Sequence, residues 1–245
     1  MIRNFFCVHN VIMTALVCLA ACMNPLMAQP DRETLLAYVM EKHGPDHGLI
    51  NGIQYANRYH RIKEHPYYRG ETFSSGAVTI SGRDYGDVLL NYDIFAQQVI
   101  LEYHGRNGGV GKIILVSEHI DAFRLGGDRF EKLSLTEKGS QFYQVIATQG
   151  AAFYIHWERQ MIPNSNDLKY TYYFSEPRGD FLLDYAGEIH RFSNRSSFQS
   201  IFPGNSGKQV RKYLRHHRFN FRKASTGELT GLLDFIVRLP QSARE

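Results

Sequence analysis

Residues 76–104, GAVTISGRDYGDVLLNYDIFAQQVILEYH, contain three short runs in which every second residue is apolar. Successive side chains of a strand point to opposite faces, so residues two apart share a face. The apolar residues that share a face within each run are Val78 and Ile80, then Val88, Leu90, Tyr92 and Ile94, then Val99, Leu101 and Tyr103. Ser81-Gly82-Arg83-Asp84 separates the first two runs as a turn, so this stretch predicts a β-meander.

The chain beyond this meander repeats the same unit as far as residue 192. Gln149-Gly150 and Ala186-Gly187 each separate two apolar runs, as the two central residues of a tight hairpin do. Counting from Val78, about ten short strands follow one another without a βαβ alternation. We therefore predict a mainly β fold, an antiparallel meander that curls into a half-barrel, a barrel or a sandwich.

Helices are predicted on both sides of the β-region. Residues 32–43 carry one apolar stripe, and Gly44-Pro45 ends that helix. Residues 208–217 form an amphipathic helix, and a last helix begins at the capping box Ser225-Thr226-Gly227-Glu228. Between these two helices, Phe219-Asn220-Phe221 alternates as a brief strand.

The domain organisation follows from these elements. We expect a leader at residues 1–28, an antiparallel β-domain with its N-terminal helix at 29–193, and a basic helical tail at 194–245. Because the apolar stripes of the tail must be buried against another element, the tail is expected to pack on the β-domain.

The first 28 residues have the pattern of an export signal. Arg3 precedes an apolar run at residues 11–21, which is too short for the roughly 20 residues that a membrane-spanning helix needs. Two processing routes stay open. Leu19-Ala20-Ala21-Cys22 resembles a lipobox, in which Cys22 would be lipidated, whereas cleavage after Ala28 is the route we favour. Either way, we expect an exported chain, periplasmic or associated with the outer membrane, with no transmembrane span after processing.

Two long stretches resemble a group of uncharacterised exported proteins common in Bacteroidetes. These stretches are GAVTISGRDYGDVLLNYDIFAQQVIL at residues 76–101 and FQSIFPGNSGKQVRKYLRHHRFNFRK at residues 198–223. Their shared patterns are those of strand and helix residues, so the resemblance implies an envelope setting and no functional residue.

The motifs for the common kinds of catalysis are missing. All three cysteines lie in the leader. The Gly-rich stretch at 105–111 does not match GxxxxGK[ST] or GxGxxG opening a helix, because a β-branched run follows it, so it predicts a hairpin turn and not a phosphate-binding loop. His43 and His47 have helical spacing, but Gly44-Pro45 interrupts the helix between them. No serine occupies a nucleophile elbow. We predict no catalytic residue, no metal site and no cofactor.

A ligand site is predicted on the polar face of the sheet. His104 and His156 alternate with apolar neighbours in their strands, and Tyr154 lies two residues before His156. If that face is concave, His104, His156 and Tyr154 could line a polar pocket. The alternative is that this face of the sheet is an outer face in contact with solvent, where the imidazole and phenol groups bind no ligand.

The positive charge is concentrated near the C-terminus. Residues 188–223 hold nine Lys and Arg against one acid, a charge of +8, whereas residues 29–187 hold 16 basic and 20 acidic residues, a charge of −4. Lys208, Arg211, Lys212 and Arg215 share the polar face of one predicted helix. We expect them to dock on an anionic lipid, glycan or protein surface of the envelope, since export argues against nucleic acid. The alternative is a solvated helix face.

These features favour an exported cell-envelope protein that binds a ligand or an envelope partner without catalysis. Two other classes stay open. One is a histidine-dependent or metal-assisted envelope hydrolase, which the histidine content allows. The other is a structural subunit of an envelope complex, which would present a large exposed apolar patch.

Overall fold

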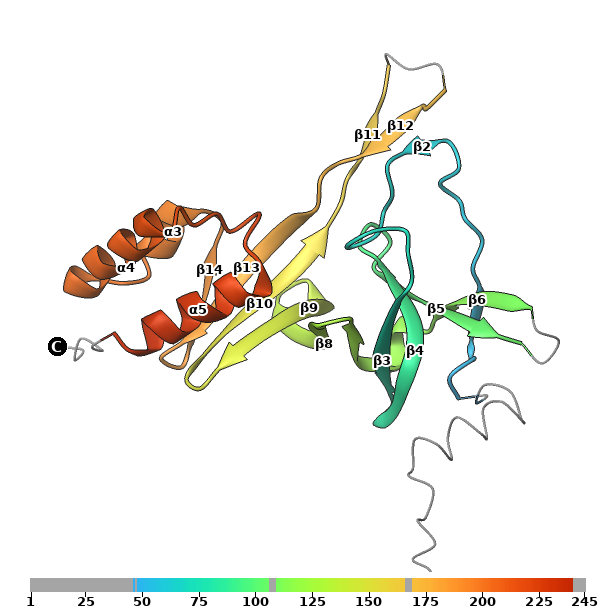
Figure 1. Cartoon of the computed structure of the whole chain (residues 1–245), viewed down its shortest axis with the longest axis horizontal. Helices are drawn as coiled ribbons and strands as arrows, with labels where there is room; N and C mark the ends of the chain where they lie inside the picture. The colour runs from blue at the N-terminus through green and yellow to red at the C-terminus, as the bar shows by residue number, and fades with distance from the viewer. Residues whose placement is uncertain (1–45, 47, 106–108, 166–168, 240–245) are drawn as a thin grey trace, which may run out of the picture. The chain divides into compact units, whose positions relative to one another are not determined.

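The fold is taken from a computed structural model, which describes residues 46, 48–105, 109–165 and 169–239. The predicted leader with Cys22 and the predicted helix at 32–43 lie outside the described residues, as do His43 and His47. Where the chain is described, it is mainly β, with a helical C-terminal segment, as predicted (Figure 1).

Eleven strands of the described chain form one antiparallel sheet, in the order β1-β6-β5-β4-β3-β7-β8-β9-β10-β13-β14. Their bounds are β1 (Gly52–Gln54), β3 (Ser74–Ile80), β4 (Arg83–Asp93), β5 (Gln98–His104), β6 (Val110–Leu115), β7 (Ile120–Leu125), β8 (Asp128–Thr136), β9 (Gly139–Thr148), β10 (Ala151–Glu158), β13 (Arg178–Tyr185) and β14 (Glu188–Phe192). The sheet is open, with β1 and β14 as its edge strands. The predicted antiparallel meander is thus confirmed.

The meander of residues 76–104 occupies the middle of this sheet as β3, β4 and β5. From β3 to β6, each strand pairs with the one before it, in the direction of the edge strand β1. The chain then returns through the short 3-10 helix η1 (Ser117–His119), and β7 pairs with the other side of β3. The turn between β3 and β4 is narrower than predicted. It consists of Ser81 and Gly82, whose φ angles of 48° and 76° are those of a two-residue hairpin, and Arg83 and Asp84 already belong to β4.

A small second sheet has the order β11-β12-β2, with β2 parallel to β12. Its strands are β2 (Ile62–Lys63), β11 (Met161–Pro163) and β12 (Tyr172–Phe174). Strands of two or three residues are too short for alternation to reveal, which is why the sequence placed none of β1, β2 and β11, although one irregular strand is expected between Leu49 and Tyr68.

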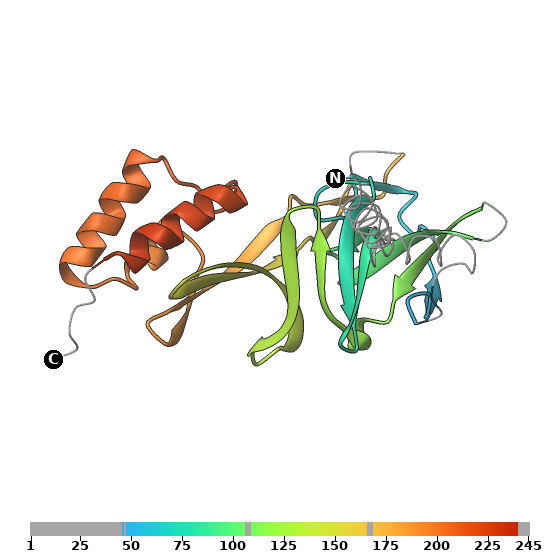
Figure 2. The same cartoon turned by 60° about the horizontal axis from the view of Figure 1, so that its bottom comes forward.

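Three described helices lie together beside the β9–β14 end of the large sheet (Figure 1; Figure 2). They are α3 (Arg195–Gln199), α4 (Gly204–His216) and α5 (Thr226–Val237). The predicted capping box of α5 is present, since the Ser225 side chain accepts from the Glu228 backbone and the Glu228 side chain accepts from the Ser225 backbone. Neither this nor any other described helix is both long and apolar enough to cross a membrane.

The helices pack on the sheet through one apolar core. From the sheet come Ile146, Phe153, Ile155, Phe181, Leu183 and Phe192; from the helices come Phe198, Val210, Leu214, Leu229, Leu232, Leu233 and Ile236. Burial of a core side chain of this size contributes about 1.5–3 kcal/mol, so this core holds the tail on the sheet.

The prediction of a brief strand at Phe219-Asn220-Phe221 is wrong. Phe219 and Phe221 are both buried, 3% and 4% exposed, and their ring centroids lie 5.0 Å apart. Asn220 forms a turn, because its side chain accepts from the Arg222 backbone and its carbonyl accepts from the Lys223 backbone. Phe219 and Phe221 therefore alternate with Asn220 because both rings enter the core from a turn, and not because the residues form a strand.

Candidate functional site

His156, the first of the predicted ligand residues, lies in the interior of the protein. It is 6% exposed on β10, and its ring centroid lies 5.7 Å from that of Tyr143. Its Nδ1 lies 3.0 Å from the carbonyl oxygen of Phe142. A carbonyl only accepts, so Nδ1 carries the proton. This imidazole is a satisfied interior group, and the solvated outer face considered for it is not what the structure shows.

Tyr154 and His104 do not join His156 in a pocket. Tyr154 is half-buried two residues before it on β10, and burial, with the nearby charges of Asp184 and Glu131, raises the pKa of Tyr154. His104 is exposed at the end of β5, which five strands separate from β10 in the order of the sheet. None of the three lines the cavities found at α3–α4 and beside Tyr55.

The four predicted docking residues are exposed on one side of α4. Lys208, Arg211, Lys212 and Arg215 are spaced at i, i+3, i+4 and i+7, which places them along one stripe of the helix. Val210 and Leu214, 0% and 1% exposed, face the core instead. The stripe is therefore free to meet another surface.

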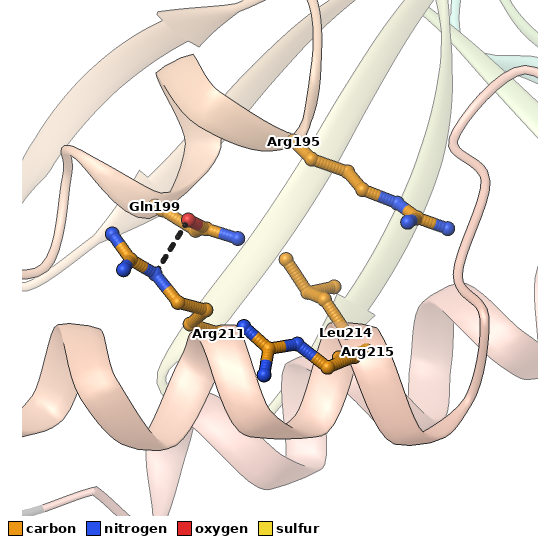
Figure 3. A pocket seen from close by; sticks show the side chains of 5 residues that line it. All are labelled: Arg195, Gln199, Arg211, Leu214 and Arg215. Atoms are coloured by element: carbon orange, nitrogen blue, oxygen red, sulfur yellow. Dashed lines mark hydrogen bonds between the residues drawn. The ribbon is translucent and has the colours of Figure 1, made fainter.

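Two residues of this stripe help to line a cavity of about 330 Å³ between α3 and α4. Arg211, Leu214 and Arg215 extend from α4, and Arg195 and Gln199 come from α3 (Figure 3). Gln199 meets Arg211, whereas the Arg195 side chain runs toward the loop after α4. Lys208 and Lys212 lie outside the lining. We call these five lining residues the arginine pocket.

Local sequence signals place the two helices of the arginine pocket. Asn194 caps α3 with its side chain, and Pro203 precedes the first residue of α4. Gly207 allows a close approach, because a Cβ there would lie 2.3 Å from the carbonyl oxygen of Phe202. Phe198 of α3 and Leu214 of α4 then enter the same core, which holds the helices in place.

The arginine pocket holds positive charge that no described carboxylate neutralises. Within the part of the chain that the structure describes, Arg195, Arg211 and Arg215 make no ion pair, whereas the neighbouring Arg191 is paired with Asp180 at 2.6 Å. Arg195 donates through Nε to the Phe219 carbonyl, and Arg211 donates through Nε to Gln199 Oε1 at 3.3 Å. These bonds orient two guanidinium groups while their terminal nitrogens stay available.

Sequence reasoning missed Arg195 and Gln199 as members of this site. Both were part of the basic segment, but they precede α4 by several residues and share no periodicity with it. The usable signal was the break at Pro203-Gly204 between two helices, which allows the chain to fold back on itself.

The chemistry of the arginine pocket is that of oxyanion binding. Guanidinium groups present planar N–H donors that match carboxylate and phosphate oxygens, and they stay protonated, so they supply no general base. Among the described residues, no group of three or more His, Cys, Asp or Glu could hold a metal ion. No protein-family model, no curated protein and no solved structure matches the chain.

Proposed function

We propose that this chain is an exported, non-enzymatic binding protein of the cell envelope that docks through α3 and α4 on an anionic component. One observation carries the docking: Arg195, Arg211 and Arg215 surround a cavity and lack carboxylate partners among the described residues. The export part of the proposal is supported by the leader pattern of residues 1–28 and by the resemblance to exported proteins.

Phosphate-bearing lipid headgroups fit the arginine pocket best. The cavity between the two helices has a volume of about 330 Å³. A compact oxyanion can enter such a cavity, whereas the flat surface of a protein partner cannot. Lys208 and Lys212 lie on the same helix outside the cavity, where they meet neighbouring headgroups of an anionic surface. Acidic glycans and acidic protein surfaces are the other partners that arginine and lysine side chains could bind.

Sedimentation with lipid vesicles tests the proposal. The exported protein should bind vesicles that contain phosphatidylglycerol and not vesicles of phosphatidylcholine alone, and binding should weaken as salt is raised. Replacing both Arg211 and Arg215 by Ala should weaken binding by about 30-fold, because each basic residue near an anionic surface contributes about 1 kcal/mol.

A matched control separates the arginine pocket from overall charge. Arg222 and Lys223 are exposed in the same basic segment but do not line the pocket. The double variant Arg222→Ala, Lys223→Ala removes the same charge and should lose much less affinity. Equal losses in the two variants, or equal binding to both kinds of vesicle, would overturn docking through the pocket.

A further inference from the structure

A second cavity, of about 560 Å³, lies among residues 55–73, Lys112 on β6 and Tyr170. This volume is within the range of small-molecule sites, which lies at roughly 300–1,000 Å³. Four aromatic side chains of the segment line it: Tyr55, Tyr59, Tyr67 and Phe73. The cavity shares no lining residue with the arginine pocket.

The hydroxyl groups of this cavity are held in place by hydrogen bonds. The Tyr55 and Tyr67 hydroxyls lie 2.6 Å apart, and the Tyr59 hydroxyl donates to Asp93 Oδ2 at 2.9 Å. Only one hydrogen lies between Tyr55 and Tyr67, so the other hydroxyl of the pair keeps a donor for a ligand. Burial, together with these neighbours, raises the pKa of both Tyr59 and Tyr67, which keeps the phenols protonated.

His65 belongs to the lining through its imidazole ring. Its ring stacks on that of Tyr67, with the centroids 5.9 Å apart. The Nδ1 atom is shielded from solvent and has no hydrogen-bond partner among the described residues. Because this atom is shielded, a ligand in the cavity meets the His65 ring but not Nδ1.

The two carboxylates of the lining oppose an anion, and Lys112 occupies one aromatic face on which a cation would bind. These carboxylates belong to Glu64 and Glu71. Lys112 opposes a cation, since its ammonium group lies 4.6 Å from the centre of the Phe73 ring, where a cationic ligand would bind. Lys112 is itself paired with Glu102 at 3.2 Å.

We infer that this cavity binds a neutral saccharide. The apolar faces of sugar rings pack on aromatic side chains, and sugar hydroxyls both donate and accept, which suits the Tyr55–Tyr67 pair and the carboxylates of Glu64 and Glu71. The site is separate from the docking of α3 and α4 and does not depend on it.

Isothermal titration calorimetry with three neutral tetrasaccharides tests the inference. The probes are maltotetraose, cellotetraose and tetra-N-acetylchitotetraose, and at least one should bind the full exported protein. Tyr55→Phe keeps the ring and loses the hydroxyl, so it should weaken binding about two- to tenfold, as expected for one hydrogen bond. Tyr55→Ala should weaken binding further, and Tyr154→Phe, outside the cavity, should have no effect.

Near-ultraviolet circular dichroism shows whether each variant is folded. If Tyr55→Ala does not fold, the affinity of Tyr55→Phe for the sugars tests the inference. The inference is overturned if none of the three tetrasaccharides binds at millimolar concentration. It is also overturned if binding is unchanged in folded Tyr55 variants, or if tetramethylammonium binds in the cavity and the sugars do not. Vesicle binding should be unaffected by Tyr55→Phe.

Discussion

Thr226, the first residue of α5, donates its hydroxyl to Oδ1 of Asp128 on β8 at 2.9 Å. Gln144 of β9 donates to the same oxygen at 3.1 Å, and Arg69 forms an ion pair with Oδ2. Gln144 in turn accepts from Trp157 Nε1 at 2.8 Å. A carboxylate that is 2% exposed thus ties the start of the helix to three strands of the sheet.

The Thr226–Asp128 bond should contribute measurably to stability. Thr226→Val should lower the free energy of unfolding by about 1 kcal/mol, since it removes one part-buried hydrogen bond. Asp128→Ala should cost about 2 kcal/mol or more, because it removes the acceptor of Thr226, one acceptor of Gln144 and the ion-pair partner of Arg69. Urea denaturation measures both, with Thr230→Val as the control, whose hydroxyl bonds a carbonyl of its own helix. Equal effects of Thr226→Val and Thr230→Val would contradict this.

Gly76 and Gly86 lie in neighbouring strands of the meander and should respond oppositely to Ala. A Cβ on Gly76 would lie 2.0 Å from the carbonyl oxygen of Arg124, so β3 and β7 would have to move apart. We expect Gly76→Ala to cost about 2 kcal/mol, as overpacking does. Gly86 has no atom within 4 Å of that position, so Gly86→Ala should be neutral or stabilise by about 0.4–1 kcal/mol. Thermal unfolding distinguishes them, and similar midpoints would refute the close packing at Gly76.

The capping box should make α5 sensitive to Ser225 and to acid. Ser225→Ala should cost about 1 kcal/mol, and Ser225→Asn should restore most of it, because Asn is also a good cap. Hydrogen bonds from the Ser225 backbone and side chain lower the pKa of Glu228. Its contribution is therefore complete above the unfolded pKa, about 4.3, and is lost as pH falls through the lower folded pKa.

The Glu228→Gln variant checks this pH dependence. The stability advantage of the wild type over Glu228→Gln should be constant near neutral pH and should shrink below about pH 4.3. Urea denaturation at several pH values measures the difference. An advantage that stays constant into acid would show that the carboxylate does not act as the cap.

Asp93 should give the opposite pH dependence. It is 1% exposed, and burial raises its pKa, although bonds from the Ala96 backbone, the Tyr59 hydroxyl and the Phe95 backbone act against that rise. A raised folded pKa means that its contribution is complete below the unfolded pKa, about 3.9, and is lost as pH rises through the folded value.

Two variants test the Asp93 prediction by denaturation across the same pH range. The stability of the wild type relative to Asp93→Asn should fall as pH rises above about 4, since only the wild type must ionise a buried group. Tyr59→Phe removes a donor to the ionised carboxylate, so it should steepen the fall. If the stability of the wild type relative to Asp93→Asn rises with pH, the pKa of Asp93 is lowered in the folded protein and the prediction is wrong.

The sequence by itself determined the local elements. The alternation in residues 76–104 defined β3, β4 and β5, Ala186-Gly187 defined the last hairpin, and Ser225 with Glu228 defined the start of α5. Each of these signals involves residues a few positions apart, whose preferences for strand, turn or cap depend on their own chemistry. The basic segment was likewise visible as a count of charges.

Only the tertiary structure decided which side chains meet. Arg195 lines one cavity with Arg211 and Arg215 because Phe198 and Leu214 share a core, and Tyr55 meets Tyr67 because the segment folds back beside β6. Burial of His156 depended on the strands that flank β10, so alternation could not foretell it. Distances between remote segments are set by the joint burial of apolar surface, a property of the whole packed core and of no short stretch.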